Sequence, residues 1–113
     1  MPAKKKASVV VTERYAPKDV KIKKRLGGGV LKELVIRQVP SGNVTHYALA
    51  YINPAIFSGD DGRVLGYDNS HGYSHKHHLG VVTPEPFTSY QQIYDRFQAE
   101  WMAIAIAYVN KGK

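Results

Sequence analysis

The segment from Gly66 to Gly80, with the sequence GYDNSHGYSHKHHLG, contains four of the five histidines in the chain. An unperturbed imidazole accepts and returns a proton near neutral pH, which no other unperturbed side chain does. Carboxylate, ammonium, phenol and amide groups lie in the same short segment. These groups suit general acid and base catalysis or metal binding, so the segment is the first candidate for a functional site.

Histidines in this pattern predict cleavage of RNA without a metal. One histidine would remove the proton of the ribose 2′-hydroxyl and a second would protonate the leaving 5′-oxygen, while a cation stabilises the charge on the phosphate. His71, together with His75 or His77, supplies the acid and base candidates. Lys76 is the candidate phosphate clamp, and Asp68 would orient a histidine by accepting its second N–H.

Aromatic and basic side chains are the candidates for substrate binding. Tyr67 and Tyr73 offer flat surfaces on which a base can stack, and Asn69 lies between them in the chain. A basic face is also predicted on a hairpin formed by residues 20–39, where it would suit RNA or an acidic protein. Its candidate contacts are Lys21, Lys23 and Arg25.

A metal site is the alternative chemical interpretation. His75 and His77 would lie on one side of an extended segment, because side chains two residues apart share a face. With His71 or Asp68 they would complete a three-ligand site for zinc or another divalent transition metal, with an open position for water. The chain has no cysteine, so histidine and carboxylate groups would supply the ligands. The remaining interpretation is a polar loop that is rich in histidine without any chemistry.

Strands and turns before the histidine segment are predicted from alternation and from turn residues. The predicted strands cover residues 8–15, 20–25, 30–39, 44–52 and 63–68. Ala16-Pro17 would end the first strand, and Asp60-Asp61-Gly62 is interpreted as a tight turn rather than a metal site. The last strand runs into the histidine segment, which we therefore expect to be a mobile loop mounted on a strand end. His46 and His78 are interpreted as bystanders.

A helix is predicted from Tyr90 to Asn110, with Ser89 as its N-cap. Apolar residues recur at steps of three and four along it, and this stripe should pack on the sheet. From Met102 onward the helix is apolar nearly all round. We expect the sheet, a second copy of the chain or a partner protein to cover that end.

The 113 residues are enough for a single domain with one modest core. We expect a flexible basic tail over residues 1–7 and a single α+β domain over residues 8–113, built as an antiparallel β-meander of four to five strands packed against one long C-terminal helix. No segment is long and apolar enough to span a membrane and no signal peptide is recognisable, which predicts a cytoplasmic protein. The net charge of +7 favours a polyanionic partner.

The sequence resembles the TumE-type toxins of bacterial toxin–antitoxin modules, roughly from Val30 to Tyr108. The residues that carry the resemblance are RVLGYDNSHG at 63–72, HKH at 75–77, the strand at 46–52 and the helix with Phe97 and Trp101. The resemblance implies a growth-inhibiting toxin that is neutralised by a small DNA-binding antitoxin. Cleavage of RNA is a separate inference, drawn from the histidine, lysine and tyrosine cluster and from the basic charge.

The leading hypothesis is therefore a metal-independent endoribonuclease toxin that uses histidine acid and base catalysis. Two alternatives stay open. One is a metal-dependent nuclease with histidine ligands. The other is a module without catalysis that binds nucleic acid or protein through the basic hairpin and the apolar helix end, which would also suit a homo-oligomer.

Overall fold

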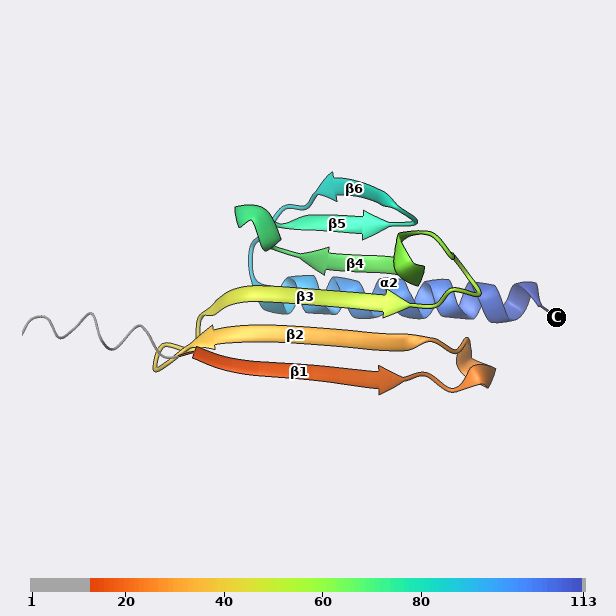
Figure 1. Ribbon diagram of the computed structural model, residues 1–113, viewed down its shortest axis with the longest axis horizontal. Helices are drawn as coiled ribbons and strands as arrows, with labels where there is room; N and C mark the ends of the chain where they lie inside the picture. Colours follow the sequence, from red (N-terminus) through yellow and green to blue (C-terminus); the bar gives the residue numbers. More distant parts are fainter. Residues whose placement is uncertain (1–12, 113) are drawn as a thin grey trace, which may run out of the picture.

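The computed structural model of the protein describes residues 13–112, apart from the side chains of residues 13–16 and 71. In this part of the chain, six antiparallel strands form one sheet in the order β1-β2-β3-β4-β5-β6, and the helix α2 runs along one face (Figure 1). The strands are β1 (Glu13–Lys21), β2 (Val30–Gln38), β3 (Val44–Ile52), β4 (Arg63–Asp68), β5 (His75–His78) and β6 (Val81–Pro84). The helix is α2 (Tyr90–Lys111), and the short 3-10 turns are η1 (Lys24–Leu26), η2 (Asp60–Gly62) and η3 (Ser70–Gly72). The predicted α+β meander is confirmed, with one strand more than the upper expected number.

The first strand differs from the prediction. A single strand, β1, runs through Ala16-Pro17, where we expected a strand to end. Pro17 lies opposite Leu34 of β2, and β1 is an edge strand, so the missing N–H of the proline removes no bond to a further strand. Residues 8–12 of the expected first strand, and the expected tail over residues 1–7, lie outside the described residues.

The basic segment Val20–Arg25 is also not a continuous strand. The chain leaves β1 after Lys21 and forms η1 at Lys24. The chain reverses at Gly27, Gly28 and Gly29, with φ angles of 117°, 74° and 89°. A Cβ on Gly29 would lie 2.6 Å from the carbonyl oxygen of Ile52, so both the backbone angle and the space require glycine there.

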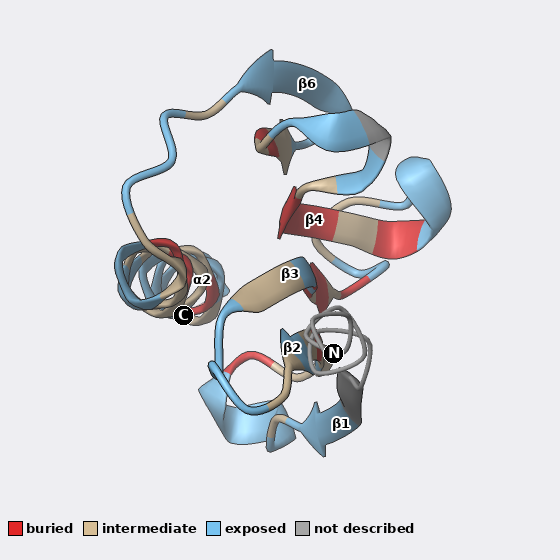
Figure 2. Ribbon diagram, turned by 90° about the vertical axis from the view of Figure 1, so that its left-hand side faces the viewer, coloured by how far each residue is buried: buried red, intermediate tan, exposed pale blue. Residues whose placement is uncertain are grey.

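The core lies between β3, β4 and α2. Tyr47, Leu49 and Tyr51 alternate along β3 and are buried on the side of the helix, as the alternation predicts. Ile93 and Phe97 are buried on the facing side of α2. Figure 2 shows that the strands curl around the helix and that its buried residues face the sheet.

The helix α2 has the predicted cap at its N-terminus and an exposed apolar surface near its C-terminus. Ser89 is the N-cap, because its Oγ accepts a hydrogen bond of 3.1 Å from the backbone N–H of Gln92. Near the other end, Met102 is 45% exposed and Ile106 is 59% exposed. The sheet therefore does not cover this apolar surface. No helix in residues 13–112 has the length and hydropathy needed to cross a membrane.

Candidate functional site

The hairpin of β4 and β5 positions the three central residues of the site. Asp68 lies opposite His75 in the antiparallel register, and Gly66 lies opposite His77. Side chains at alternate positions of a strand share a face, so the carboxylate and both imidazoles are on one side of the sheet. The histidine segment is therefore not the expected mobile loop, because its second half is the paired strand β5.

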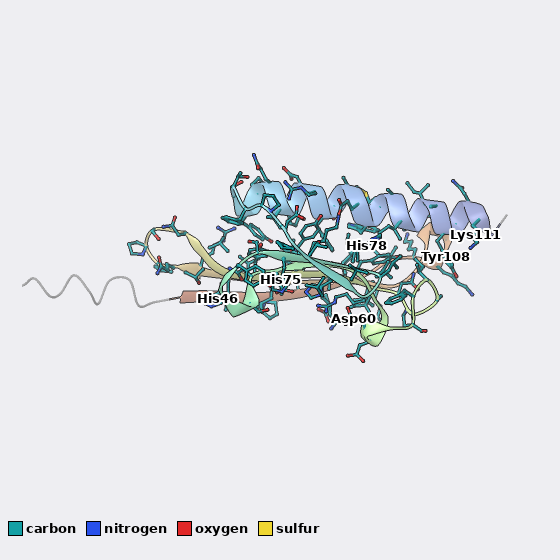
Figure 3. All side chains as sticks on the ribbon, turned by 90° about the horizontal axis from the view of Figure 1, so that it is seen from above. His46, Asp60, His75, His78, Tyr108 and Lys111 are labelled. Carbon is teal, nitrogen blue, oxygen red and sulfur yellow. The ribbon has the colours of Figure 1, made fainter. Side chains whose placement is uncertain are left out.

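This side of the sheet is the one that faces away from α2. His78, the next residue after His77, lies between the sheet and the helix, whereas Asp60 lies on the opposite side (Figure 3). Across β3, the residue opposite Asp68 is Ala48 and the residue opposite Gly66 is Ala50. Small side chains therefore lie next to the cluster on this face.

Asp68 joins the two histidines. Its Oδ1 is 2.7 Å from His75 Nε2, and its Oδ2 is 2.9 Å from His77 Nε2. The hydroxyl of Ser70 donates to Oδ1 over 2.8 Å, and the backbone N–H of Ser70 donates to the same atom over 3.2 Å. His75 is 4% exposed and Asp68 is 9% exposed. The carboxylate is thus fixed in a nearly buried position with its oxygens directed at two imidazole nitrogens.

The second ring nitrogen of His75 also has a defined partner. Nδ1 is 3.1 Å from the backbone carbonyl oxygen of Tyr73, which can only accept a hydrogen bond, so Nδ1 carries a hydrogen. In the neutral ring, Nε2 then presents its lone pair to Asp68, another acceptor. Two groups that both accept hydrogen bonds at 2.7 Å need a proton or a metal ion between them.

The donor set fits a transition metal ion. One ligand atom each from Asp68, His75 and His77 can be chosen so that all lie within 4.8 Å of one another. A tetrahedral zinc site, with bonds of about 2.0–2.1 Å, separates its ligand atoms by roughly 3.3 Å, so the contacts of Asp68 would have to widen by about half an ångström. A histidine ligand ordinarily donates its other N–H to a backbone carbonyl, as His75 does. Three protein ligands leave a position for water or substrate.

Arg63 and Asp60 border the cluster, and sequence reasoning assigned no role to this arginine. Arg63 Nε donates to Asp60 Oδ2 over 2.9 Å, and its Nη2 donates to Oδ1 over 3.2 Å. The hydrogen bond from Arg63 lowers the pKa of Asp60. A Cβ on Gly66 would lie 2.9 Å from Arg63 Cδ, so the glycine lets the arginine stem cross the sheet beside His77. The spacing of three residues between Asp60 and Arg63 around a turn was the feature of the sequence from which this ion pair could have been predicted.

Lys76 is not beside the histidines. Its Nζ donates to Glu100 Oε2 on α2 over 3.1 Å and lies 5.6 Å from the centre of the Tyr67 ring. Tyr67 is fully buried and donates its hydroxyl to Glu100 Oε1 over 2.6 Å. Burial raises the pKa of Tyr67, and the hydrogen bond to Glu100 raises it further. Neither the expected phosphate clamp nor the expected stacking surface is therefore on the face of the cluster, because both side chains point to the helix.

The three remaining candidates of the segment are Asn69, Tyr73 and His71. Asn69 accepts from the backbone N–H of Tyr47 and donates to the carbonyl of Thr45, both over 3.0 Å, so its amide fastens η3 to β3. Tyr73 is 55% exposed and its ring centre is 5.1 Å from that of His75, which keeps it available to a substrate. The backbone of His71 lies in η3, but its side chain is outside the described part of the structure.

The basic candidates lie elsewhere. Lys21, Lys23 and Arg25 are exposed around the connection between β1 and β2, at the end of the sheet opposite to η3 (Figure 1). They do not line the cluster of Asp68, His75 and His77. Of the other histidines, His46 is exposed with Nδ1 3.1 Å from Thr45 Oγ1.

Comparisons with known proteins leave the chain without an assigned family. No family model matches the sequence, and no curated protein and no solved structure matches it. The resemblance to the TumE-type toxins therefore stays a prediction that rests on the residues at 67–72 and 75–77.

Proposed function

We propose that the protein is a metal-dependent nuclease that binds a divalent transition metal ion, such as zinc, through Asp68, His75 and His77. One observation carries the proposal. The Nε2 atoms of both histidines converge on the carboxylate of Asp68, while Nδ1 of His75 is held by the carbonyl of Tyr73. Both histidines thus direct Nε2 toward the same carboxylate, which brings three candidate ligands for one cation together.

RNA is the proposed substrate, and the proposed biological role is the toxin of a bacterial toxin–antitoxin module in the cytoplasm. The net charge of +7 supports a polyanionic substrate. The toxin role and the DNA-binding antitoxin partner rest on the resemblance to the TumE-type toxins. The exposed apolar surface of α2 around Met102 and Ile106 is the candidate contact for the antitoxin or for a second copy.

In this proposal, each residue of the cluster has a separate role. Ser70 fixes the Asp68 carboxylate, and Tyr73 fixes the ring of His75, so the ligands are held in position before a substrate arrives. Arg63, whose side chain is 28% exposed beside Gly66, would contact a phosphate oxygen if its pairing with Asp60 opened. A divalent ion at such a site polarises a phosphoryl oxygen and generates a nucleophile from water at neutral pH.

The metal-independent endoribonuclease is the second candidate. The distances of 2.7 and 2.9 Å from Asp68 are ordinary lengths for hydrogen bonds between a carboxylate and imidazoles, which need no ion. It is less well supported as a two-histidine mechanism, because both ring nitrogens of His75 face protein acceptors and Lys76 is bound to Glu100. In this version His77 would act alone or with His71.

Metal content and chelator sensitivity separate the two candidates. The protein is purified without a histidine tag, its metal content is measured by mass spectrometry, and cleavage of single-stranded RNA is followed in a chelator and after addition of zinc, manganese or magnesium. We expect about one ion per chain, loss of cleavage in the chelator and recovery with one of the metals. Cleavage that is undiminished in the chelator would favour the metal-independent candidate, and intact RNA under all conditions would contradict both.

Matched variants test whether the cluster is responsible. His77→Ala should remove the metal and the cleavage, whereas His78→Ala changes the next residue of the same strand on the opposite face and should change neither. Expression in bacteria adds the biological readout. The wild type and His78→Ala should arrest growth, and His77→Ala should not.

A further inference from the structure

A groove of about 700 Å³ opens at the end of the sheet where η3 lies close to the connection between β6 and α2. Three aromatic residues line it, namely Tyr47, Tyr73 and Phe87. Sequence reasoning assigned no function to Phe87 or to this connection. The groove lies on the chain segments that flank the cluster on both sides, since Tyr73 precedes β5 and Phe87 follows β6.

Two of the three rings are accessible. Tyr73 is 55% exposed and Phe87 is 50% exposed, while the buried Tyr47 supports Phe87 in a stacked arrangement with ring centres 6.0 Å apart and an interplanar angle of 20°. Each exposed ring thus offers a face to a flat ligand. Exposed aromatic rings gathered in one groove are typical of binding sites rather than of ordinary protein surface.

One residue, Tyr73, both lines the groove and contacts the cluster. The ring of Tyr73 lies 5.1 Å from the ring of His75, and the carbonyl of the same tyrosine holds His75 Nδ1. A ligand that stacks on Tyr73 is therefore next to the imidazole that we propose as a metal ligand. Ser74 adds a polar group to the groove, and its Oγ accepts a hydrogen bond of 2.6 Å from the Tyr47 hydroxyl.

We propose that this groove binds an unpaired nucleobase of single-stranded RNA, stacked on Tyr73 and Phe87, beside the phosphate that is cleaved. The inference rests on the proposed nuclease function and specifies its substrate. A base presents its ring face only when it is outside a duplex, so the groove selects single strands. The described residues that line the groove include no lysine or arginine, so it offers no positive charge to an acidic antitoxin peptide, and its one carboxylate, Glu85, is paired with Arg96.

Binding is measured apart from cleavage. The probe is a fluorescently labelled single-stranded RNA of mixed sequence and about 12 nucleotides, titrated with protein in the presence of a chelator and followed by anisotropy. We expect the Kd to rise by about tenfold to a hundredfold in Tyr73→Ala and in Phe87→Ala. The same RNA annealed to its complement should bind the wild type more weakly than the single strand. Val81→Ala, which removes an exposed apolar side chain of β6, should bind like the wild type.

Two further substitutions at residue 87 separate stacking from apolar contact. Phe87→Trp keeps an aromatic face and should bind within about threefold of the wild type, whereas Phe87→Leu keeps apolar volume without a ring and should bind as weakly as Phe87→Ala. Thermal unfolding checks that each variant is folded. Because Phe87 contacts Tyr47, the variants of Phe87 can be destabilised. In that case the RNA affinity of Tyr73→Ala, which changes an exposed side chain, decides the test.

Each outcome bears on one proposal. Unchanged RNA binding in both alanine variants, or full binding by Phe87→Leu, would overturn the base-binding groove, and so would the absence of RNA binding by the wild type. If the protein holds metal and cleaves RNA while the variants bind normally, only the groove is wrong. If it holds no metal and cleaves nothing but loses RNA binding in the variants, the nuclease is wrong and the groove stands.

Discussion

The two faces of β5 carry two polar clusters with different partners. On the face toward α2, the carboxylate of Glu100 receives the ammonium of Lys76 at 3.1 Å and the hydroxyl of Tyr67 at 2.6 Å. On the outer face, the carboxylate of Asp68 faces the imidazoles of His75 and His77 at 2.7 and 2.9 Å. The inner carboxylate has a cation that is charged at neutral pH, whereas the charge beside the outer carboxylate depends on a proton or a metal ion.

This difference indicates different tasks. The inner cluster contains its own positive charge and connects the helix to the sheet, so it acts on stability. The outer cluster joins groups from a single hairpin and has no hydrogen bond to the helix among the described residues, so we assign it to the proposed metal site rather than to stability. Substitutions on the two faces should therefore change different measured quantities.

The largest expected effect is on the outer face. Asp68→Asn keeps the shape of the side chain but removes a charged ligand, so we expect metal affinity to fall by more than about a hundredfold. Titration calorimetry with zinc measures the affinity, and RNA cleavage should fall in parallel. Zinc affinity close to that of the wild type would remove the basis for distinguishing the two faces.

The next effect is on the inner face. Glu100→Gln removes the charge that both Lys76 and Tyr67 contact, and we expect the free energy of unfolding to fall by about 1–2 kcal/mol. Urea denaturation measures this loss, and the metal content should stay that of the wild type. Loss of metal in this variant would mean that the two faces are coupled.

A smaller effect is expected from Tyr67→Phe, at about 0.5–1.5 kcal/mol of unfolding free energy near neutral pH. Burial and the bond to Glu100 raise the pKa of Tyr67, so the folded state keeps this proton when the unfolded chain loses it. The corresponding stability is present below about pH 10 and is lost as the pH rises above it. Urea denaturation above about pH 10 should therefore show a shallower loss of stability with pH in Tyr67→Phe than in the wild type.

The smallest effect is expected at the border of the outer cluster. The pKa of Asp60 is lowered by Arg63, so its ion pair stabilises the fold above the ordinary aspartate value of about 3.9 and is lost as the pH falls below it. Because both side chains are partly exposed, the contribution should be below about 0.5 kcal/mol. Asp60→Asn should therefore have almost the same free energy of unfolding as the wild type at neutral pH in urea denaturation. As the pH is lowered below about 3.9, its stability should fall slightly less than that of the wild type. A loss of several kcal/mol would show that Asp60 supports the cluster itself.

Local patterns predicted the parts of the fold that local forces determine. The bounds of β3 and β4 and the capped start of α2 agree with the sequence, because alternation, turn residues and Ser89 act over a few neighbouring residues. The strands β5 and β6 were not predicted as strands. β5 contains only histidine and lysine, which have weak strand propensity, and β6 has only three strand-forming residues before Pro84. Pairing of β5 with β4 and of β6 with β5 therefore determines their conformation.

The candidate site was predicted in part for the same reason. Asp68, His75 and His77 come together because period-two alternation is a property of any strand. The same rule separates Lys76 from its neighbours, and grouping it with the histidines by closeness in the chain was misleading. Arg63 reaches the cluster because its side chain passes over Gly66, and Phe87 lines a groove formed by segments that are distant in the chain. Neither arrangement can be predicted from a local sequence pattern.

The order of the strands has a consequence for how the molecule forms. Every pairing within the sheet joins strands that are consecutive in the chain, so each hairpin closes over a short loop. Folds that are dominated by such local contacts tend to fold fast, since little loop entropy is lost before contacts form. The three proposed metal ligands belong to one hairpin, so all of them are synthesised before the helix that completes the core.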